Sequence, residues 1–148
     1  MKKQPTLRER ALRLLARREH SRAELGRKLA AHVGPEDDLD ALLEDLQRGK
    51  LLSDERYAES RSHALSRKFG AARIVQELRA KGLDKGLAEG AVAAARTTEV
   101  ERARVVWLRK FRTAPATREE RARQMRFLQS RGFSFDAIRA VVRSADED

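Results

Sequence analysis

Carboxylates cluster in one short segment of the chain, and carboxylates at close spacing are suited to holding a divalent metal ion. Residues 34–48 contain six acidic residues and a single arginine. Glu36, Asp37, Asp38 and Asp40 form the densest part of this segment. They lack the alternating ligands and the central glycine of a calcium loop. We expect them to favour a helix N-terminus and to form a solvated or partner-facing surface; a metal-dependent nuclease that uses this cluster stays open as an alternative.

The phrase LSDERYAES, residues 51–59, brings two acids, an arginine and a tyrosine together. With Ser53 as a helix N-cap, Asp54 and the glutamate after it fall in the first helical turn, where negative charge complements the helix dipole. Leu52 and Tyr57 then have the spacing of a hydrophobic staple. Because each residue has a structural role in this interpretation, the phrase predicts the start of a helix and not a reaction centre.

Other common catalytic patterns are missing from the sequence. There is no cysteine, which excludes disulfides, thiol catalysis and cysteine-ligated zinc. None of His20, His32 and His63 has a second histidine or a carboxylate at convincing metal-ligand spacing. There is also no glycine-rich phosphate loop and no Ser/His/Asp order that suggests a nucleophile. We expect no catalytic residue, no metal and no cofactor.

The composition favours a polyanionic partner. The 148 residues carry a formal net charge of +10, and 25 of the 33 basic residues are arginine. A charge this positive is typical of proteins that bind nucleic acid, although a solvated, arginine-rich surface is the alternative. The start of the chain has no apolar run after its lysines, and no window is apolar enough for a membrane span. We therefore expect a cytoplasmic protein without membrane association, and a monomer.

Apolar residues recur at helical spacing nearly throughout, without the alternation of strands, so the fold class is predicted to be all-α. Capping boxes, in which a Ser or Thr and a Glu three residues later bond each other's backbone, mark four helix starts. The four pairs are Thr6 with Glu9, Ser21 with Glu24, Thr98 with Glu101, and Thr117 with Glu120.

Further signals place the other helix ends. Pro35 is expected at a first helical position, and Gly34, Gly82 and Gly132 are expected to end helices. The remaining predicted caps are Ser53, Asp84 and Ser134. Together these signals predict about nine helices joined by short loops.

The three glycines expose an internal repeat. Gly34 and Gly82 are 48 residues apart, and Gly82 and Gly132 are 50 apart. The segments LRAKGLDKGLAEGAV and LQSRGFSFDAIRAVV align without a gap around the last two glycines. We predict an elongated array of three tandem three-helix repeats, at 1–49, 50–97 and 98–148. One globule of nine helices with chance similarity is the alternative.

The few aromatic residues are assigned mainly to the core. Trp107 and Phe111 lie one helical turn apart and would suit base stacking, but a protein poor in aromatics needs such a pair in its core. The residues assigned to the core are Tyr57, Ile74, Leu78, Trp107, Leu128 and Ile138.

Four segments, taken in order, resemble a known family. REHSRAEL (18–25), LSDERYAES, GAARIVQELRAKG (70–82) and RFLQSRGFSFDAI (126–138) are similar to successive signature segments of RecX, the bacterial regulator of the RecA recombinase. The stretch RARVVWLRKF matches only loosely. The resemblance implies a non-enzymatic modulator that lies in the groove of RecA filaments on DNA. Members usually inhibit filament growth, ATP hydrolysis, strand exchange and co-protease activity, and some bind DNA directly.

Charge is uneven along the repeats, which suggests where such partners bind. Residues 8–28 and 102–143 carry net charges of +5 and +9, whereas residues 34–48 carry −5. We expect the RecA filament as the main partner, and weaker electrostatic binding of single- and double-stranded DNA. The alternative is a basic helical-repeat protein that binds nucleic acid without RecA contact. The contact candidates, chosen by charge and repeat position, are Arg17, Arg18, Arg22, Lys28, Lys68, Arg73, Arg79, Lys81, Arg121, Arg126 and Arg131.

Overall fold

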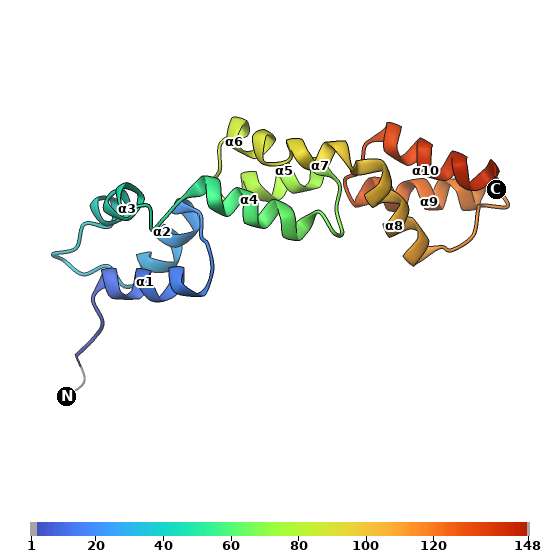
Figure 1. Ribbon diagram of the computed structural model, residues 1–148. Coiled ribbons are helices and arrows are strands. Elements are labelled where there is room, and N and C mark those ends of the chain that lie inside the picture. Colours follow the sequence, from blue (N-terminus) through green and yellow to red (C-terminus); the bar gives the residue numbers. More distant parts are fainter. Residues whose placement is uncertain (1–2, 148) are drawn as a thin grey trace.

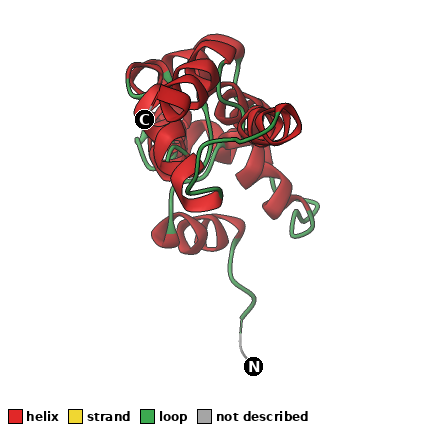
Figure 2. Ribbon diagram, turned by 90° about the vertical axis from the view of Figure 1, so that its right-hand side faces the viewer, coloured by secondary structure: helices red, strands yellow, loops and turns green. Residues whose placement is uncertain are grey.

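The computed structural model describes the backbone of residues 3–147 and the side chains of residues 3–143. Every regular element in that range is a helix and none is a strand, which confirms the all-α prediction (Figure 2). The helices form three groups that follow one another along an elongated molecule (Figure 1). No described helix has the length and apolar character that crossing a membrane requires.

The first and third groups each contain three helices, as predicted. The first group lies at the N-terminal end of the molecule and the third at the C-terminal end (Figure 1). Their helices are α1 (Leu7–Arg17), α2 (Arg22–Ala30), α3 (Leu39–Arg48), α8 (Glu99–Lys110), α9 (Arg118–Ser130) and α10 (Phe135–Glu147).

The middle group has a fourth, short helix. It consists of α4 (Asp54–Leu65), α5 (Ala71–Ala80), α6 (Lys85–Ala91) and α7 (Ala93–Thr97). The break falls at Val92, whose φ of −99° and ψ of 2° are not helical. Two glycines in the segment KGLAEGA, which are poor helix formers, weaken the helix before this point. The described chain therefore has ten helices where about nine were expected.

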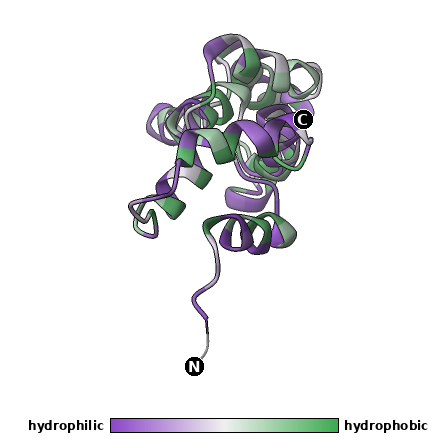
Figure 3. Cartoon of the chain, turned by 90° about the vertical axis from the view of Figure 1, so that its left-hand side faces the viewer, coloured by the Kyte–Doolittle hydropathy of each residue, from purple (hydrophilic) through white to green (hydrophobic). Residues whose placement is uncertain are grey.

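Each group has an apolar core of its own, and all six residues assigned to the core are buried. The three cores are distinct clusters, so the groups do not share one continuous core. Leu52 packs in the first core and Tyr57 in the second, so the predicted staple between these two side chains is wrong. Hydrophilic and hydrophobic stretches alternate around the helices, as expected where each helix turns one face to a small core (Figure 3).

The predicted helix starts are confirmed only in part. Thr6 and Glu9 form a complete capping box, and Ser21 and Thr117 accept the expected backbone hydrogen bond. Thr98 does not cap α8: its ψ of 12° is not extended, and its hydroxyl donates to the carbonyl of Ala95 at 3.3 Å. The caps at Ser53, Asp84 and Ser134 are confirmed.

The first repeat departs from the glycine pattern. Helix α2 ends at Ala30, before Gly34, so Gly34 is not its stop. Pro35 follows in a turn closed by a hydrogen bond from the Asp37 amide to the Gly34 carbonyl at 3.1 Å, and α3 begins only after its N-cap Asp38. The predictions for Gly34 and Pro35 are therefore wrong. Two carboxylates of the acidic segment stabilise this region: Asp37 accepts from the Gly34 amide in the turn, and Asp38 caps the start of α3.

Gly82 and Gly132 end α5 and α9 as predicted, with φ of 89° and 85°. In both places the amide after the glycine donates to a carbonyl five residues earlier, at 3.3 Å, which is the Schellman motif. A Cβ on Gly132 would overlap Arg73 in the second repeat, and one on Gly82 would overlap Ala23 in the first. These two glycines thus end a helix and also allow the preceding repeat to approach closely.

The close approach stacks the second helices of the three repeats end to end. The hydroxyl of Ser21 before α2 donates to the carbonyl of Lys81 after α5 at 2.8 Å. The amide of Gly70 before α5 donates to the carbonyl of Arg131 after α9, also at 2.8 Å. In each case the positive end of one helix dipole meets the negative end of another, which is favourable.

Replacing Gly132 by alanine should destabilise the protein, because alanine is strained at this positive φ and its Cβ would overlap Arg73. We expect the free energy of unfolding, measured in urea, to fall by more than about 1 kcal/mol. Gly90→Ala is the matched control, since that Cβ would meet nothing within 4 Å in a helix. It should raise stability by about 0.5–1 kcal/mol. Equal effects at the two positions would contradict this account of Gly132.

Candidate interaction surface

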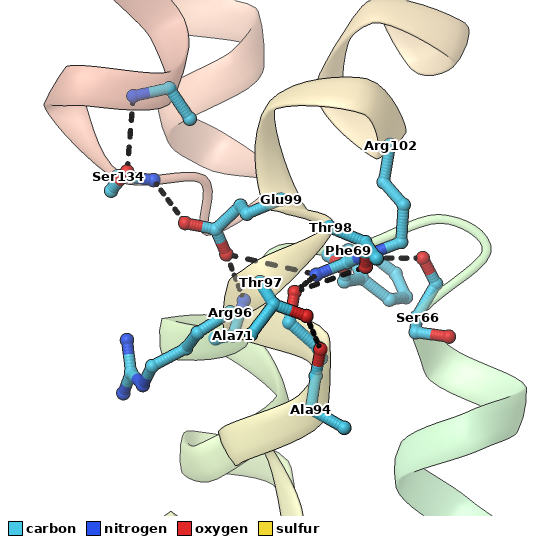
Figure 4. Close-up of polar contacts among 12 residues, drawn as sticks. Ser66, Phe69, Ala71, Ala94, Arg96, Thr97, Thr98, Glu99, Arg102 and Ser134 are labelled. Atoms are coloured by element: carbon cyan, nitrogen blue, oxygen red, sulfur yellow. Dashed lines mark hydrogen bonds and ion pairs between the residues drawn. The ribbon is translucent and has the colours of Figure 1, made fainter.

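Glu99, the first residue of α8, holds the second and third repeats together (Figure 4). Its buried carboxylate accepts a hydrogen bond from the Ala71 amide at 2.6 Å and another from the Ser134 amide at 3.1 Å. These amides lie at the starts of α5 and α10, where backbone N–H groups have no partner inside the helix. One carboxylate therefore accepts hydrogen bonds from the N-terminal amides of two helices that belong to different repeats.

Arg102 completes this junction one turn further along α8 (Figure 4). Its guanidinium donates to the carbonyls of Ser66 at 2.8 Å, Phe69 at 2.7 Å and Ala95 at 2.6 Å. It also lies 3.9 Å from the Glu99 carboxylate. Burial lowers the pKa of Arg102, although Glu99 opposes that effect. The side chain is thus used to hold the loop after α4 and the end of α7, and it is not available to a partner.

The first junction repeats the same arrangement with another acid. Asp54, the first residue of α4, accepts a hydrogen bond from the amide of Arg22, the first residue of α2, at 2.7 Å. Asp54 therefore does in the first junction what Glu99 does for Ala71 in the second. The role predicted for Asp54 was only to complement the dipole of its own helix, so this contact with the preceding repeat is new.

A buried acid neutralises two basic side chains at the first junction. Glu24 accepts two hydrogen bonds from the guanidinium of Arg18, both at 3.0 Å, and lies 3.6 Å from the ammonium of Lys81. The hydrogen bonds from Arg18 lower the pKa of Glu24 to about 2. Arg18 and Lys81 were both predicted to contact a partner, and here they bind a carboxylate of the same chain.

The remaining contact candidates divide into engaged and available side chains. Arg22 donates to Gln47, and Lys28 lies 2.9 Å from the imidazole of His20. Arg121 is half-buried on α9. The exposed candidates whose side chains have no hydrogen bond or ion pair within the described part of the chain are Arg17, Lys68, Arg79 and Arg126.

A cleft of about 280 Å³ lies at the second junction and brings two of the candidates together. Lys68 and Arg131 line it, with Val106 and Phe127 as apolar neighbours. Three further basic residues that sequence reasoning did not select complete the lining: Arg67, Arg109 and Lys110. The five come from three separate segments, so no short motif identified them.

The structure assigns ordinary structural roles to His20 and Trp107. His20 is buried with Nδ1 3.1 Å from the Arg18 carbonyl, and burial lowers its pKa. Trp107 is buried and its indole N–H donates to Gln124 at 2.7 Å, which confirms its place in the core. Among the residues that the structure describes, no three His, Asp or Glu side chains are grouped to hold a metal.

The fold and the surface together define a class: a tandem array of three-helix domains with polar junctions and a strongly basic surface. Three domain profiles of RecX match the chain, the first three-helix domain at residues 8–46, the second at 53–92 and the third at 97–142. The chain therefore belongs to the RecX family, and the predicted fold of three tandem three-helix repeats is confirmed. The exact boundaries between the repeats stay a prediction.

Named relatives agree with this membership, and a solved structure shares the fold. The chain is 52% identical to the regulatory protein RecX of Leptothrix cholodnii, over 98% of this chain and 92% of the relative. It is 44% identical to that of Herminiimonas arsenicoxydans, over 99% and 97%. The crystal structure of RecX from Lactobacillus salivarius superposes with a TM-score of 0.83 at 24% identity, covering 96% of each chain. That likeness concerns the fold alone.

Removing the carboxylate of Glu99 should loosen the second junction. In Glu99→Ala, the buried Ala71 amide and the part-buried Ser134 amide lose their acceptor, and we expect the free energy of unfolding to fall by about 1–3 kcal/mol. Hydrogen exchange at Ala71 and Ser134 should accelerate more than exchange within the first repeat. Glu101→Ala, an exposed acid on the same helix, is the control and should change neither quantity.

Stability should fall in acid partly because of Glu24. Its folded pKa of about 2 lies below its ordinary value of 4.5. The carboxylate therefore stabilises the fold fully above pH 4.5, and this contribution is lost as the pH falls towards 2. In Glu24→Gln the unfolding free energy should be lower at pH 7 and should vary less between these pH values. Parallel pH profiles for the two proteins, measured in urea, would contradict this role.

Proposed function

We propose that this protein regulates the RecA recombinase by binding RecA filaments on DNA, and that it inhibits their ATPase, recombinase and co-protease activities. Membership of the RecX family supports a regulatory role, since the relatives are named regulatory proteins. In this proposal the protein acts as a monomer in the cytoplasm, without catalysis and without a cofactor.

The observation that carries the proposal is the distribution of available basic side chains along an elongated array (Figure 1). Arg17 lies in the first repeat, Lys68 and Arg79 in the second, and Arg126 in the third. A molecule that offers cations at intervals along its length suits a long polyanionic partner, such as a filament that contains DNA. A single compact ligand would require these side chains to converge on one site.

A second function, direct nucleic-acid binding without RecA, is favoured by the cationic cleft at the second junction. The two functions differ in what RecA changes. A protein that binds only phosphates should lose affinity steeply with salt and should bind DNA equally well with and without RecA. A filament regulator should bind RecA-coated DNA more tightly than bare DNA.

The decisive experiment measures ATP hydrolysis by RecA on single-stranded DNA with substoichiometric amounts of this protein. We expect the rate to fall and the protein to sediment with the filaments. An unchanged rate together with absence from the filament pellet would reject the proposal.

Charge reversal at two available residues should weaken filament binding and leave the fold intact. Arg79→Glu with Arg126→Glu replaces exposed cations of the second and third repeats, and we expect about tenfold weaker binding or more because their contacts with phosphates or acidic groups are lost. The helical circular dichroism spectrum should not change. Arg8→Glu with Arg13→Glu, an equal charge change on exposed positions of α1, is the control and should have a smaller effect.

A further inference from the structure

The two junctions of the array contain equivalent clefts of equal size, each about 280 Å³. Lys81 lines the first cleft and Arg131 the second, and each directly precedes the positive-φ glycine that ends the second helix of its repeat. Arg18 lines the first cleft and Arg67 the second, and each lies three residues before the N-cap of a second helix. The same structural positions therefore supply basic side chains to both clefts.

At two further positions, in or beside the clefts, the side chains of the two junctions carry charges of opposite sign. Glu19 lines the first cleft, and the residue at its position in the second cleft is Lys68. Glu24 is the third residue of α2, and the third residue of α5 is Arg73. Glu19 and Glu24 thus correspond to the bases Lys68 and Arg73, of which only Lys68 lines the second cleft. Arg73 turns aside and donates to the carbonyl of Ser130 at 3.0 Å.

The second cleft consequently has cations without an internal anion. Within the described part of the chain, none of its five basic side chains forms an ion pair with a carboxylate. Like charges that line one cleft repel one another, so a bound anion would be favoured. At the first junction the carboxylate of Glu24 relieves the same repulsion between Arg18 and Lys81.

Two of the cations are held in place before any anion arrives. The guanidinium of Arg131 lies 5.5 Å from the ring centre of Phe69 and 5.1 Å from that of Phe127. The ammonium of Lys110 lies 5.5 Å from the centre of the Phe127 ring. The face of an aromatic ring attracts a cation. The N–H groups of that cation stay free to bind an anion. The ordering of Arg131 and Lys110 therefore reduces the entropy lost when an anion binds.

We propose that the second-junction cleft binds a phosphate group of a nucleic-acid backbone, in the place that the Glu24 carboxylate occupies at the first junction. Guanidinium groups such as those of Arg67 and Arg131 match phosphate oxygens in two-point hydrogen bonding. The same two helices, α8 and α9, carry further exposed basic residues, which suits a chain of phosphates better than an isolated carboxylate. The further exposed basic residues of α8 and α9 are Arg104, Arg118, Arg123 and Arg126.

The bound phosphate would also link the two repeats. Arg67 belongs to the loop after α4, Arg109 to α8 and Arg131 to the end of α9. An anion held among these three positions connects the second repeat to the third, as Glu24 connects the first to the second. This inference rests on the proposed function only in that nucleic acid forms part of the filament, and its test omits RecA.

The test measures binding of a fluorescein-labelled twelve-nucleotide thymidine oligomer by fluorescence anisotropy. In the double variant Arg109→Gln with Lys110→Gln, we expect the affinity to fall about tenfold. The slope of log affinity against log salt should also become shallower by about 1.4, because each phosphate contact with a single strand contributes about 0.7. Arg13→Gln with Arg27→Gln removes the same charge from exposed positions in the first repeat and should have little effect. Equal losses in both variants would overturn the proposal, because net charge alone would then explain binding.

A second variant places an acid where the first junction has one. Arg73→Glu should supply an internal partner for the cations of the cleft, so that oligomer binding is lost while thermal stability is kept or increased. Arg27→Glu is the control with the same charge change. Wild-type affinity in a folded Arg73→Glu protein would overturn the equivalence of the two junctions. If Arg73→Glu does not fold, the Arg109 and Lys110 variant decides.

Competition identifies the chemical class of the anion. Unlabelled thymidine oligomer should displace the labelled one, and poly-glutamate of equal charge should do so at least tenfold less well. Equal displacement by poly-glutamate would overturn the assignment to nucleic acid and indicate an acidic protein partner. None of these measurements contains RecA, so a failed ATPase experiment with intact oligomer binding would reject the proposed function and leave this inference standing.

Discussion

The shape of this protein depends on hydrogen bonds that helix N-terminal amides donate to carboxylates at the two junctions. Each repeat has a separate apolar core, so apolar packing within one core does not fix how the repeats sit relative to one another. The first amides of α2 and α5 have no partner within their helices, and leaving them unpaired at a packed junction would be costly. Asp54 and Glu99, each the first residue of the next repeat's first helix, supply the acceptors.

This way of joining repeats uses part of the basic surface for the structure itself. Arg102 binds three carbonyls, and Arg18 and Lys81 bind Glu24, so these cations are already satisfied inside the chain. The basic residues behind the net charge of +10 therefore have two roles: some hold the structure together and others are available to a partner. The charge available to a partner lies on exposed side chains such as Arg79 and Arg126, and in the cleft of the second junction.

The sequence predicted what is local and repeated, and it failed where a role depends on another repeat. Gly82 and Gly132 were found because a Schellman glycine follows an apolar helix in both copies. Asp54 was placed correctly at a helix start, but its contact with the preceding repeat was missed. An acid that complements its own helix dipole has the same sequence pattern as one that caps a neighbouring helix. Gly34 was misread because α2 ends earlier than its counterparts do. The cationic cleft needed three distant segments, whose meeting only the fold reveals.

In the proposed binding mode, the difference between the two junctions would also give the array a direction. If all repeats were alike, the array could shift by one repeat along an extended, periodic partner and still fit equally well. Binding in a single register therefore requires features that differ between repeats. The first junction neutralises its own cations through Glu24, whereas the second carries Lys68 and Arg73 at the positions of Glu19 and Glu24. A partner displaced by one repeat would therefore put a phosphate beside the acids of the first junction, which repel it. In the proposed binding mode, these charge differences on a repeated backbone would favour one register and one orientation.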